Sequence, residues 1–497
     1  MAETKSSMPV AEIAAGKLQG EQRTGVIAFH GVPYAAAPVG TLRFAPPQPA
    51  PAWSGIRDAT QRAASPPQGP SRLDAVMGKS DFAQDEDCLT VSVWTPAADN
   101  KRRPVFVWLH GGAYQSGGGN QVFYDGGNLA AVGDMVFVGV NYRLGALGYL
   151  YLPGAEAHGA APANRGLLDQ MAALEWVQQN IEAFGGDPEN VTLAGQSAGG
   201  GSAFALLSVA RSRRLFHRAI LQSAPSVMLD SAQAAAYSAR YYELAGVAAG
   251  DLDGLRALPV ADIVATQRKL QMEIATRDAR SIAFQMVRDL PPFETPAGKV
   301  LETGEARDMP LLIGSTLDEG HAWMAQDEVM RAETDFGPVL EIARKAFRED
   351  GSGLPAGRRE AASKPWELLS AILTWTVFEK TVLNYAQAHM KSGGQVWTYR
   401  FDWRPTADAR YGACHCIEIP FVFDNLAFWP EAEMVAGRDA QSFQTLVRAV
   451  QNAWIAFARH GNPQTPTMPQ WPRWNDTQRS VMVLDNRLRL ENAPSSV

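Results

Sequence analysis

The sequence has little cysteine and no excess of positive charge, and each shortage excludes a class of protein. Three cysteines in 497 residues cannot form a disulfide framework, and their odd number leaves at least one free thiol. Lys and Arg together number 45 against 52 Asp and Glu, a formal net charge of -7. These counts argue against a secreted disulfide scaffold and against nucleic acid or an anionic membrane surface as a partner.

The chain also lacks a long apolar run. Its first residues are interrupted by Glu3, Lys5, Glu12 and Lys17, so they do not resemble a secretory signal. Residues 190–210 are uncharged but too rich in glycine and polar side chains to span a bilayer. We therefore expect a cytoplasmic protein without a membrane partner. The sequence leaves its oligomeric state open and is compatible with a monomer.

What the chain does have is the composition of a large globular protein. Hydrophobic residues make up 46% and charged residues 20%, which is enough apolar material for a sizeable core. Length alone suggests about three domains. With basic clusters absent, a small molecule is the expected partner.

Short runs rich in β-branched and aromatic residues alternate with helical patterns, which predicts an α/β fold. The predicted strands are 105–109, 135–142, 191–194, 219–221, 311–313 and 396–401. The clearest helix has apolar residues three or four positions apart on one face: Leu167, Met171, Leu174, Val177, Ile181 and Phe184. Gly185 should end it, because glycine accepts the left-handed conformation at a helix end. Segments 226–310 and 323–391 are mostly helical in pattern, and we expect them to be insertions over a substrate site.

The motif Gly-Gln-Ser-Ala-Gly at 195–199 is typical of a nucleophile elbow, a strained strand-to-helix turn that exposes a serine. A predicted strand precedes it, and the small apolar segment 198–209 can form a buried helix after it. The motif alone is weak, and a plain glycine-rich turn is the alternative. The context favours Ser197 as a nucleophile.

A serine nucleophile needs a base and donors for the oxyanion that forms. The sequence His-Gly-Gly-Ala at 110–113 follows a predicted strand and resembles an oxyanion loop of the HGGG type. The expected donors are the backbone N–H groups of Gly112, Ala113 and Ala198. The alternative is a glycine-rich connection between a strand and a helix.

Matching segments run almost from end to end and jointly resemble the type-B carboxylesterases, the branch of the α/β hydrolases that includes cholinesterase-like and para-nitrobenzyl-esterase-like proteins. They are 31–35, 42–44, 86–89, 108–113, 141–143, 164–170, 184–190 and the elbow. The resemblance implies a mostly parallel central sheet flanked by helices. It also implies one domain over 1–497 in place of three, with ion pairs between Arg43 and Glu86 and between Arg143 and Asp169.

In α/β hydrolases the acid and then the histidine follow the serine along the chain, which leaves His217, His321, His389, His415 and His460 as candidates. The segment 412–418 resembles the family's histidine loop, which makes His415 the general base. The segment 314–320 resembles the one that carries the acid, and we assign Glu319. Asp318 competes with it, and its other role would be to cap the next helix. Ser223 matches a family serine that hydrogen-bonds near the acid, and is at best a supporting residue.

The same resemblance makes two departures informative. The family has glycine where this chain has Cys416, and we expect an ordinary backbone conformation there, because positive φ strains other residues. Cys88 has no upstream cysteine to pair with and should be free and buried. Cys414 and Cys416 flank His415 too closely to form a zinc site, so we expect no metal, and no cofactor.

These inferences predict a serine carboxylesterase that acts on a small-molecule ester through an acyl-enzyme and, by resemblance, tolerates bulky alcohol groups. Cholinesterase activity is not expected, because the loop before residue 86 has no tryptophan for a quaternary ammonium. The same triad acting on an amide, carbamate or lactone is the alternative, and a non-catalytic binding module is a remote one. Five residues near the acid and histidine segments could line the pocket or belong to the core: Trp323, Met324, Phe421, Phe423 and Trp429.

Overall fold

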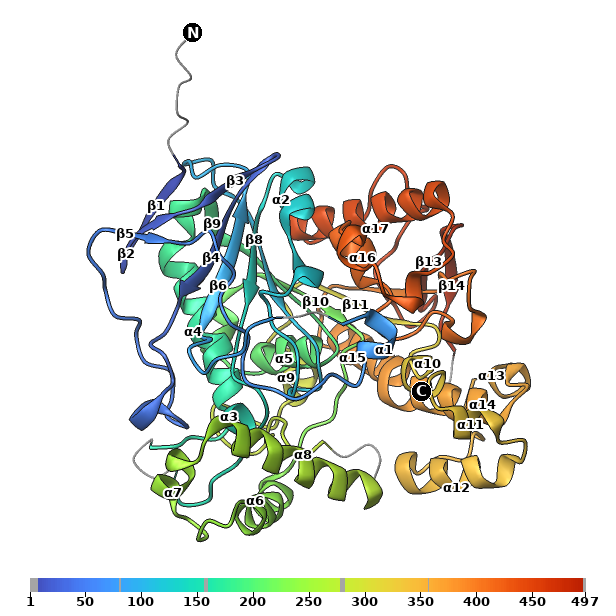
Figure 1. Ribbon diagram of the computed structural model, residues 1–497. Helices are drawn as coiled ribbons and strands as arrows, with labels where there is room; N and C mark the ends of the chain where they lie inside the picture. The colour runs from blue at the N-terminus through green and yellow to red at the C-terminus, as the bar shows by residue number, and fades with distance from the viewer. Residues whose placement is uncertain (1–7, 80–81, 156–159, 278–281, 356, 495–497) are drawn as a thin grey trace.

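The computed structural model describes residues 8–79, 82–155, 160–277, 282–355 and 357–494. Its centre is a sheet of 11 strands (Figure 1). In spatial order they are β14 (Arg489–Asn492), β13 (Ser480–Leu484), β12 (Val396–Phe401), β11 (Leu311–Thr316), β10 (Arg218–Gln222), β9 (Gly186–Gln196), β7 (Arg103–Leu109), β8 (Val136–Val140), β6 (Thr90–Thr95), β4 (Val26–Pro33) and β3 (Glu21–Arg23). A second sheet of 3 strands joins β1 (Val10–Ile13), β2 (Gly16–Gln19) and β5 (Ile56–Asp58).

The middle of the large sheet is parallel. Strands β13, β12, β11, β10, β9, β7 and β8 run in one direction, while β14 at one edge and β6, β4 and β3 at the other are paired antiparallel. The carboxyl ends of parallel strands meet at one edge, where loops can combine side chains from distant parts of the chain.

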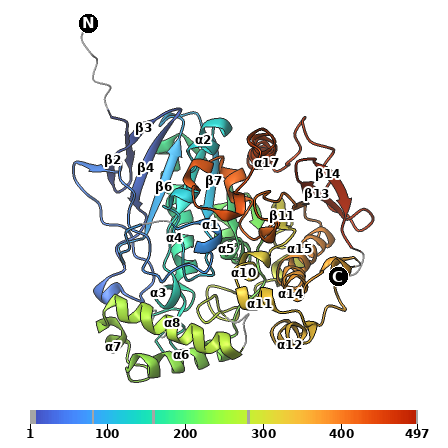
Figure 2. The same cartoon turned by 45° about the vertical axis from the view of Figure 1, so that its right-hand side comes forward.

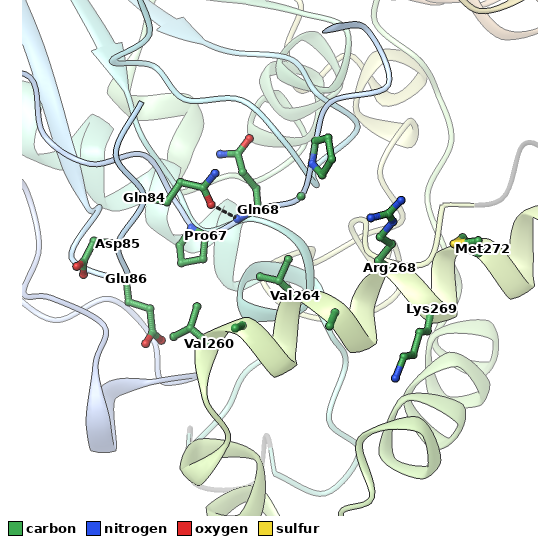
Figure 3. A pocket seen from close by; sticks show the side chains of 14 residues that line it. Pro67, Gln68, Gln84, Asp85, Glu86, Val260, Val264, Arg268, Lys269 and Met272 are labelled. Atoms are coloured by element: carbon green, nitrogen blue, oxygen red, sulfur yellow. Dashed lines mark hydrogen bonds between the residues drawn. The ribbon is translucent and has the colours of Figure 1, made fainter. Parts of the chain in front are cut away.

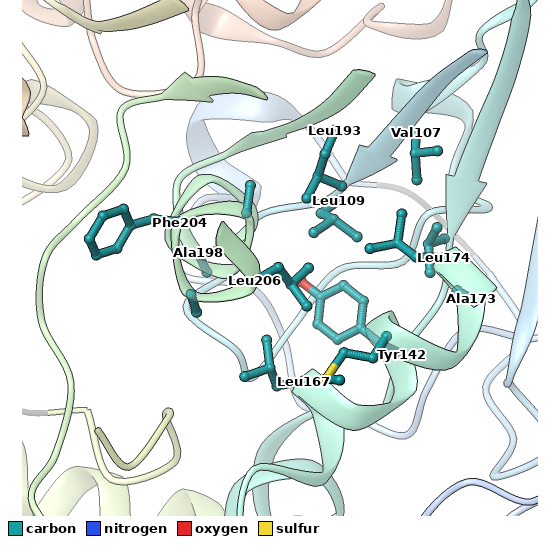
Figure 4. Packing of buried hydrophobic residues seen from close by; sticks show 14 of the residues in the cluster. Val107, Leu109, Tyr142, Leu167, Ala173, Leu174, Leu193, Ala198, Phe204 and Leu206 are labelled. Atoms are coloured by element: carbon teal, nitrogen blue, oxygen red, sulfur yellow. The ribbon is translucent and has the colours of Figure 1, made fainter. Parts of the chain in front are cut away.

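Alternate residues along the central strands face two separate apolar cores. Val105, Val107 and Leu109 of β7 join the core that includes α4 (Arg165–Asn180) and α5 (Ala198–Leu207), part of which Figure 4 shows. The intervening Phe106 and Trp108 join the core on the other face. That face is covered by α2 (Gly127–Gly133), α16 (Ile419–Phe423) and α17 (Ala440–His460).

The sequence predictions agree with this architecture. Each predicted strand corresponds to an observed one, and 396–401 has the bounds of β12. The amphipathic helix is α4 followed by a 3-10 turn (Ile181–Phe184), and Gly185 ends it at a φ of 76°. The predicted α/β fold, with a mostly parallel central sheet flanked by helices, is therefore confirmed. The N-terminal strands and β13 and β14 lie outside the predicted set.

Helices fill the two long connections after β10 and β11. The first contains α6 (Ser231–Ala245), α7 (Leu252–Ala257), α8 (Val260–Arg277) and α9 (Lys299–Thr303). The second contains α10 (His321–Met324), α11 (Glu328–Ala332), α12 (Phe336–Phe347), α13 (Arg358–Ala361), α14 (Pro365–Leu373), a π-helical turn (Thr374–Glu379) and α15 (Lys380–Lys391). Both views place α6, α7, α8, α11, α12 and α14 below the sheet (Figures 1 and 2). Residues 278–281 and 356 of the expected insertions lie outside the described residues.

Three smaller predictions concern cysteines, ion pairs and membranes. All 3 cysteines are free and buried, Cys88 included. The expected pairs are present, with 2.6 Å between Arg43 and Glu86 and 2.7 Å between Arg143 and Asp169. Across the described ranges, no helix has the length and apolar character needed to cross a membrane.

Candidate active site

Ser197 stands on a sharp turn between β9 and α5, with φ at 57° and ψ at −125°. Two glycines make the turn sterically feasible. A Cβ at Gly195 would overlap the backbone of Gly199, and one at Gly199 would overlap the carbonyl oxygen of Leu109. The serine side chain is only partly buried, so the turn presents a nucleophilic oxygen to the outside of the sheet edge.

The structure brings Ser197, His415 and Glu319 together. The Ser197 Oγ lies 2.8 Å from Nε2 of His415, and Nδ1 of the same ring lies 2.5 Å from Oε2 of Glu319. The other oxygen of Glu319 accepts a hydrogen bond from the N–H of Thr316 at 2.8 Å. The three side chains come from three loops at the carboxyl ends of the sheet, which is the geometry for proton transfer from the hydroxyl.

Asp318, the competing acid, points elsewhere. Its carboxylate accepts the N–H of Ala413 at 2.9 Å and pairs with Arg404 at 3.0 Å. It therefore fixes the start of the histidine loop and leaves the imidazole to Glu319.

The electrostatics around His415 favour its charged form. Burial alone would lower the pKa of the imidazole, but Cys416 and the Glu319 carboxylate oppose it and hold that pKa well above its ordinary value. We attribute the rise to Glu319, because burial also raises the pKa of the Cys416 thiol and so keeps it neutral. The Glu319 carboxylate thus makes the His415 imidazole a stronger base.

The glycine loop after β7 supplies unused donors. Gly112 and Ala113 have φ values of 116° and 54°, and a Cβ at Gly112 would overlap the carbonyl oxygen of Ser116. No hydrogen bond in the described part of the chain uses their N–H groups. Ala198, at the first position of α5, has no partner within its helix for its own N–H. The three predicted donors are therefore available for an oxyanion.

His110 and Tyr142 stabilise the start of this loop by contacting each other. Their rings stack at 4.4 Å, and the Tyr142 hydroxyl donates to the carbonyl of His110 at 2.7 Å. Burial lowers the pKa of His110 to about 4, so this ring is neutral near pH 7. Its role is structural.

Of the five aromatic and sulfur side chains that could line a pocket, one lies against the triad. The ring of Trp323 is 4.9 Å from that of His415, and Phe378, which the sequence did not indicate, is 5.0 Å away. Trp323 is partly exposed, so it is available to a bound substrate. The other four are buried and pack against other apolar residues: Met324, Phe421, Phe423 and Trp429.

Two residues differ from expectation. The prediction of an ordinary backbone at Cys416 is wrong, because its φ is 74°. Two hydrogen bonds stabilise the turn. The N–H of Ile419 donates to the carbonyl of Cys416 at 3.1 Å, and the Cys416 thiol donates to the side-chain oxygen of Gln196 at 3.5 Å. Ser223 is buried with φ at 47°, but its hydroxyl has no hydrogen-bond partner among the described residues.

An open groove of about 780 Å³ has none of the triad residues in its lining (Figure 3). Its walls are the loop Pro67–Pro70, residues 84–86 and one side of α8, from Val260 to Met272. Gln68 connects the groove to the segment that follows the oxyanion loop, because its side chain accepts the N–H of Gly117 at 2.6 Å and donates to the carbonyl of Gly117 at 2.7 Å.

The order of the three residues along the chain gives the class. Serine precedes acid, and acid precedes histidine, which is the order of the α/β hydrolases and differs from that of other serine hydrolase folds. Fold, elbow and order together make the chain an α/β hydrolase.

The comparison with protein families is specific. The model of the carboxylesterase family matches residues 7–496, and the chain belongs to this family. It is 37% identical over 484 residues to the para-nitrobenzyl esterase of Bacillus subtilis, covering 97% of this chain and 96% of that one. It is 35% identical to the phenmedipham hydrolase of Pseudarthrobacter oxydans, with 96% and 95% covered.

Solved structures of carboxylesterases are also similar to this protein. A thermophilic para-nitrobenzyl esterase superposes with a TM-score of 0.88 at 34% identity, covering 99% of both chains. The carboxylesterase of Geobacillus stearothermophilus gives 0.84 at 35% identity, with 98% of each chain covered. The predicted type-B carboxylesterase is confirmed, and the protein is a carboxylic ester hydrolase that acts on small-molecule esters.

Proposed function

We propose that Ser197, His415 and Glu319 carry out ester hydrolysis through an acyl-enzyme. His415 Nε2 takes the proton of Ser197 as the hydroxyl attacks the ester carbonyl, and the Glu319 carboxylate holds the imidazolium that forms. The N–H groups of Gly112, Ala113 and Ala198 stabilise the oxyanion. The 2.8 Å approach of His415 to Ser197 is the observation that carries this assignment.

In the second half of the cycle the same groups act in reverse. The imidazolium of His415 protonates the leaving alcohol, and the neutral ring then deprotonates a water that attacks the acyl group on Ser197. The carboxylic acid leaves, and the serine recovers its proton.

Replacement of the nucleophile tests the proposal. Ser197→Ala should reduce the hydrolysis of p-nitrophenyl acetate to less than about 1% of the wild-type rate and abolish labelling by a fluorophosphonate probe. Ser208→Ala is the matched control, because this serine lies just beyond α5 and bonds only the carbonyl of Phe204. A Ser197→Ala protein that still takes the label would contradict the assignment, as would loss of labelling in the control.

We also propose tolerance of bulky alcohols, as the resemblance implied. The oxyanion loop presents only hydrogen or methyl side chains at 111–113, and Gly112 and Ala113 are partly exposed. Small side chains leave room beside the carbonyl for a branched alcohol. The wild-type enzyme should hydrolyse tert-butyl acetate, and Ala113→Val should reduce this activity more than that on ethyl acetate. An equal loss of activity on both esters would contradict the proposed tolerance of bulky alcohols.

The same machinery acting on a carbamate is the second candidate, and the similarity to a phenmedipham hydrolase favours it. A carbamate would acylate Ser197 in the same way, with slower release of the carbamoyl group. Pre-steady-state kinetics with excess p-nitrophenyl carbamate should show a burst of one equivalent of nitrophenol per active site. No burst and no turnover would leave esters alone as substrates.

Two broader proposals accompany the chemistry. The chain is one catalytic unit, because the three triad loops follow β9, β11 and β12 across most of its length. It acts in the cytoplasm, a location that its 3 free cysteines suit. Its oligomeric state is open and compatible with a monomer, which a sedimentation coefficient for a particle of 53.8 kDa would test. The intact triad weighs against a purely binding role.

A further inference from the structure

A second carboxylic acid lies buried behind the triad. Glu418 is three positions after His415, at the N-terminal boundary of α16, and only 1% exposed. One of its oxygens accepts a hydrogen bond from Nε2 of Gln222 at 3.2 Å, and the other has no partner among the described residues. No salt bridge of the described chain includes it. A buried carboxylate without a cation is costly, so this side chain calls for an explanation.

Gln222 connects Glu418 to the nucleophile. It is the last residue of β10, and its carbonyl oxygen accepts the backbone N–H of Ser197 at 2.8 Å. Its side-chain oxygen accepts Nε1 of Trp454 at 2.9 Å, which turns the amide nitrogen toward Glu418. One residue thus joins the elbow of Ser197, through its backbone carbonyl, to the turn that carries His415, through its side-chain amide.

The titratable groups that face Glu418 come from three loops and one strand, while β10 and α17 contribute the uncharged Gln222 and Trp454. They are Glu319 after β11, the histidine-loop residues Cys414, His415 and Cys416, Tyr399 of β12 and Tyr124 of the 3-10 turn Val122–Tyr124. His415 is the one member that becomes positive within this group. The Tyr399 hydroxyl and one carboxyl oxygen of Glu418 both have no hydrogen-bond partner among the described residues.

We propose that Glu418 is a positioning residue of the reaction, which through Gln222 fixes the elbow against the histidine loop and, once ionised, adds a second negative charge that stabilises the imidazolium of His415. The proposal rests on the proposed function, because it assumes that His415 becomes charged during turnover. It assigns no contact with the substrate to Glu418.

The titration of Glu418 makes this role depend on pH. Burial and the nearby Glu319 raise its pKa to about 7, although His415 and Gln222 oppose the rise. The side chain is therefore neutral at pH 6 and negative at pH 8.5. Since a negative charge favours the imidazolium, the contribution to kcat should be absent at the lower pH and present at the higher one.

The experiment compares kcat of wild type and Glu418→Gln on p-nitrophenyl acetate from pH 5.5 to 9. The ratio of the wild-type kcat to the Glu418→Gln kcat should lie within about twofold of 1 at pH 6 and rise to about 10 at pH 8.5, with KM unchanged. Asp424→Asn is the matched control. Asp424 ends α16, and burial also raises its pKa, but it lies apart from Gln222 and its bonded neighbour is Gln444. The ratio of the wild-type kcat to the Asp424→Asn kcat should stay at about 1 over the whole pH range.

A ratio that is constant over the pH range, whether 1 or larger, would overturn the proposal, because a purely structural role does not titrate at this site. Labelling of Glu418→Gln by a fluorophosphonate probe separates this failure from failure of the triad itself.

Should Glu418→Gln fail to fold, Trp454→Phe tests the same connection. It keeps an aromatic ring but removes the donor to the Gln222 side-chain oxygen, which should weaken the bond from Gln222 to Glu418 and shift the inflection at which the Glu418 contribution to kcat appears to higher pH. An unchanged inflection would contradict the proposal.

Discussion

The serine side and the histidine side of the site are built on different physical grounds. On the serine side, Ser197 and the oxyanion loop stand between regular elements, and backbone atoms approach so closely that only glycine fits at Gly112 and Gly199. On the histidine side, a loop carries a cysteine in the left-handed region and buries the carboxyl groups of Glu319 and Glu418 together.

The difference teaches which kind of change each side tolerates. Steric contacts fix the serine side, so added atoms there should act on folding and activity at every pH. Charges and hydrogen bonds fix the histidine side, so changes there should act through protonation. Substitutions of matched size on the two sides can test this contrast.

The largest effect is expected from Gly199→Ala. The new methyl group would overlap the carbonyl of Leu109, and the strain should cost about 3 kcal/mol of unfolding free energy. Urea unfolding measures that loss, and ester hydrolysis should fall more than about 100-fold. Gly69→Ala is the control, because a Cβ there meets nothing within 4 Å. Similar losses in both variants would contradict the steric account.

The next effect concerns pH. Because Glu319 holds the pKa of His415 above its ordinary value, the base should be lost as pH falls through that raised pKa. We expect kcat/KM for p-nitrophenyl acetate to decline below an inflection that lies above 6.5, and Glu319→Gln to move the inflection to lower pH. A profile that is flat between pH 6 and 9 would show that the histidine side does not depend on this charge.

A smaller effect is expected from Trp323→Leu. The ring lies 4.9 Å from His415 and shields it from water, so its loss should lower kcat about tenfold while unfolding changes by less than about 1 kcal/mol. Phe421→Leu, at a fully buried residue of the core against which Trp323 packs, should instead lower the stability and leave kcat nearly unchanged. Equal losses of stability in the two variants would contradict the distinction.

The smallest effect is expected from relief of strain at Cys416. Its φ of 74° favours glycine, so Cys416→Gly should stabilise the protein by about 1 kcal/mol relative to Cys416→Ala in urea unfolding. Both variants lose the thiol contact with Gln196, so their difference reports backbone strain alone. A Gly variant less stable than the Ala variant would show that this turn is not strained.

Much of the serine side could be predicted from the sequence, because its determinants are local. An apolar strand, a glycine on each side of Ser197 and a small-residue helix follow one another along the chain, and the glycine loop at 110–113 follows its own strand. The histidine side lacks such a pattern. Five histidines followed the serine, and only resemblance to a family selected His415.

The backbone of that loop shows where inference from the residue type failed. A cysteine suggested ordinary φ at position 416, yet tertiary contacts with Gln196 hold it in the left-handed region. Phe378 lies beside His415 because a π-helical turn carries it there, and no spacing in the sequence predicts that contact.

The sequence by itself predicted the class of fold and proposed a nucleophile with its oxyanion donors, because these follow from periodicity and from the steric need for small residues within a few positions. Only the tertiary structure decided which side chains surround the base. Glu418, Gln222 and Trp454 lie in three distant segments, and their bonds exist because β10, α16 and α17 meet behind the triad. Electrostatic environment depends on distances in space, which residue order does not specify.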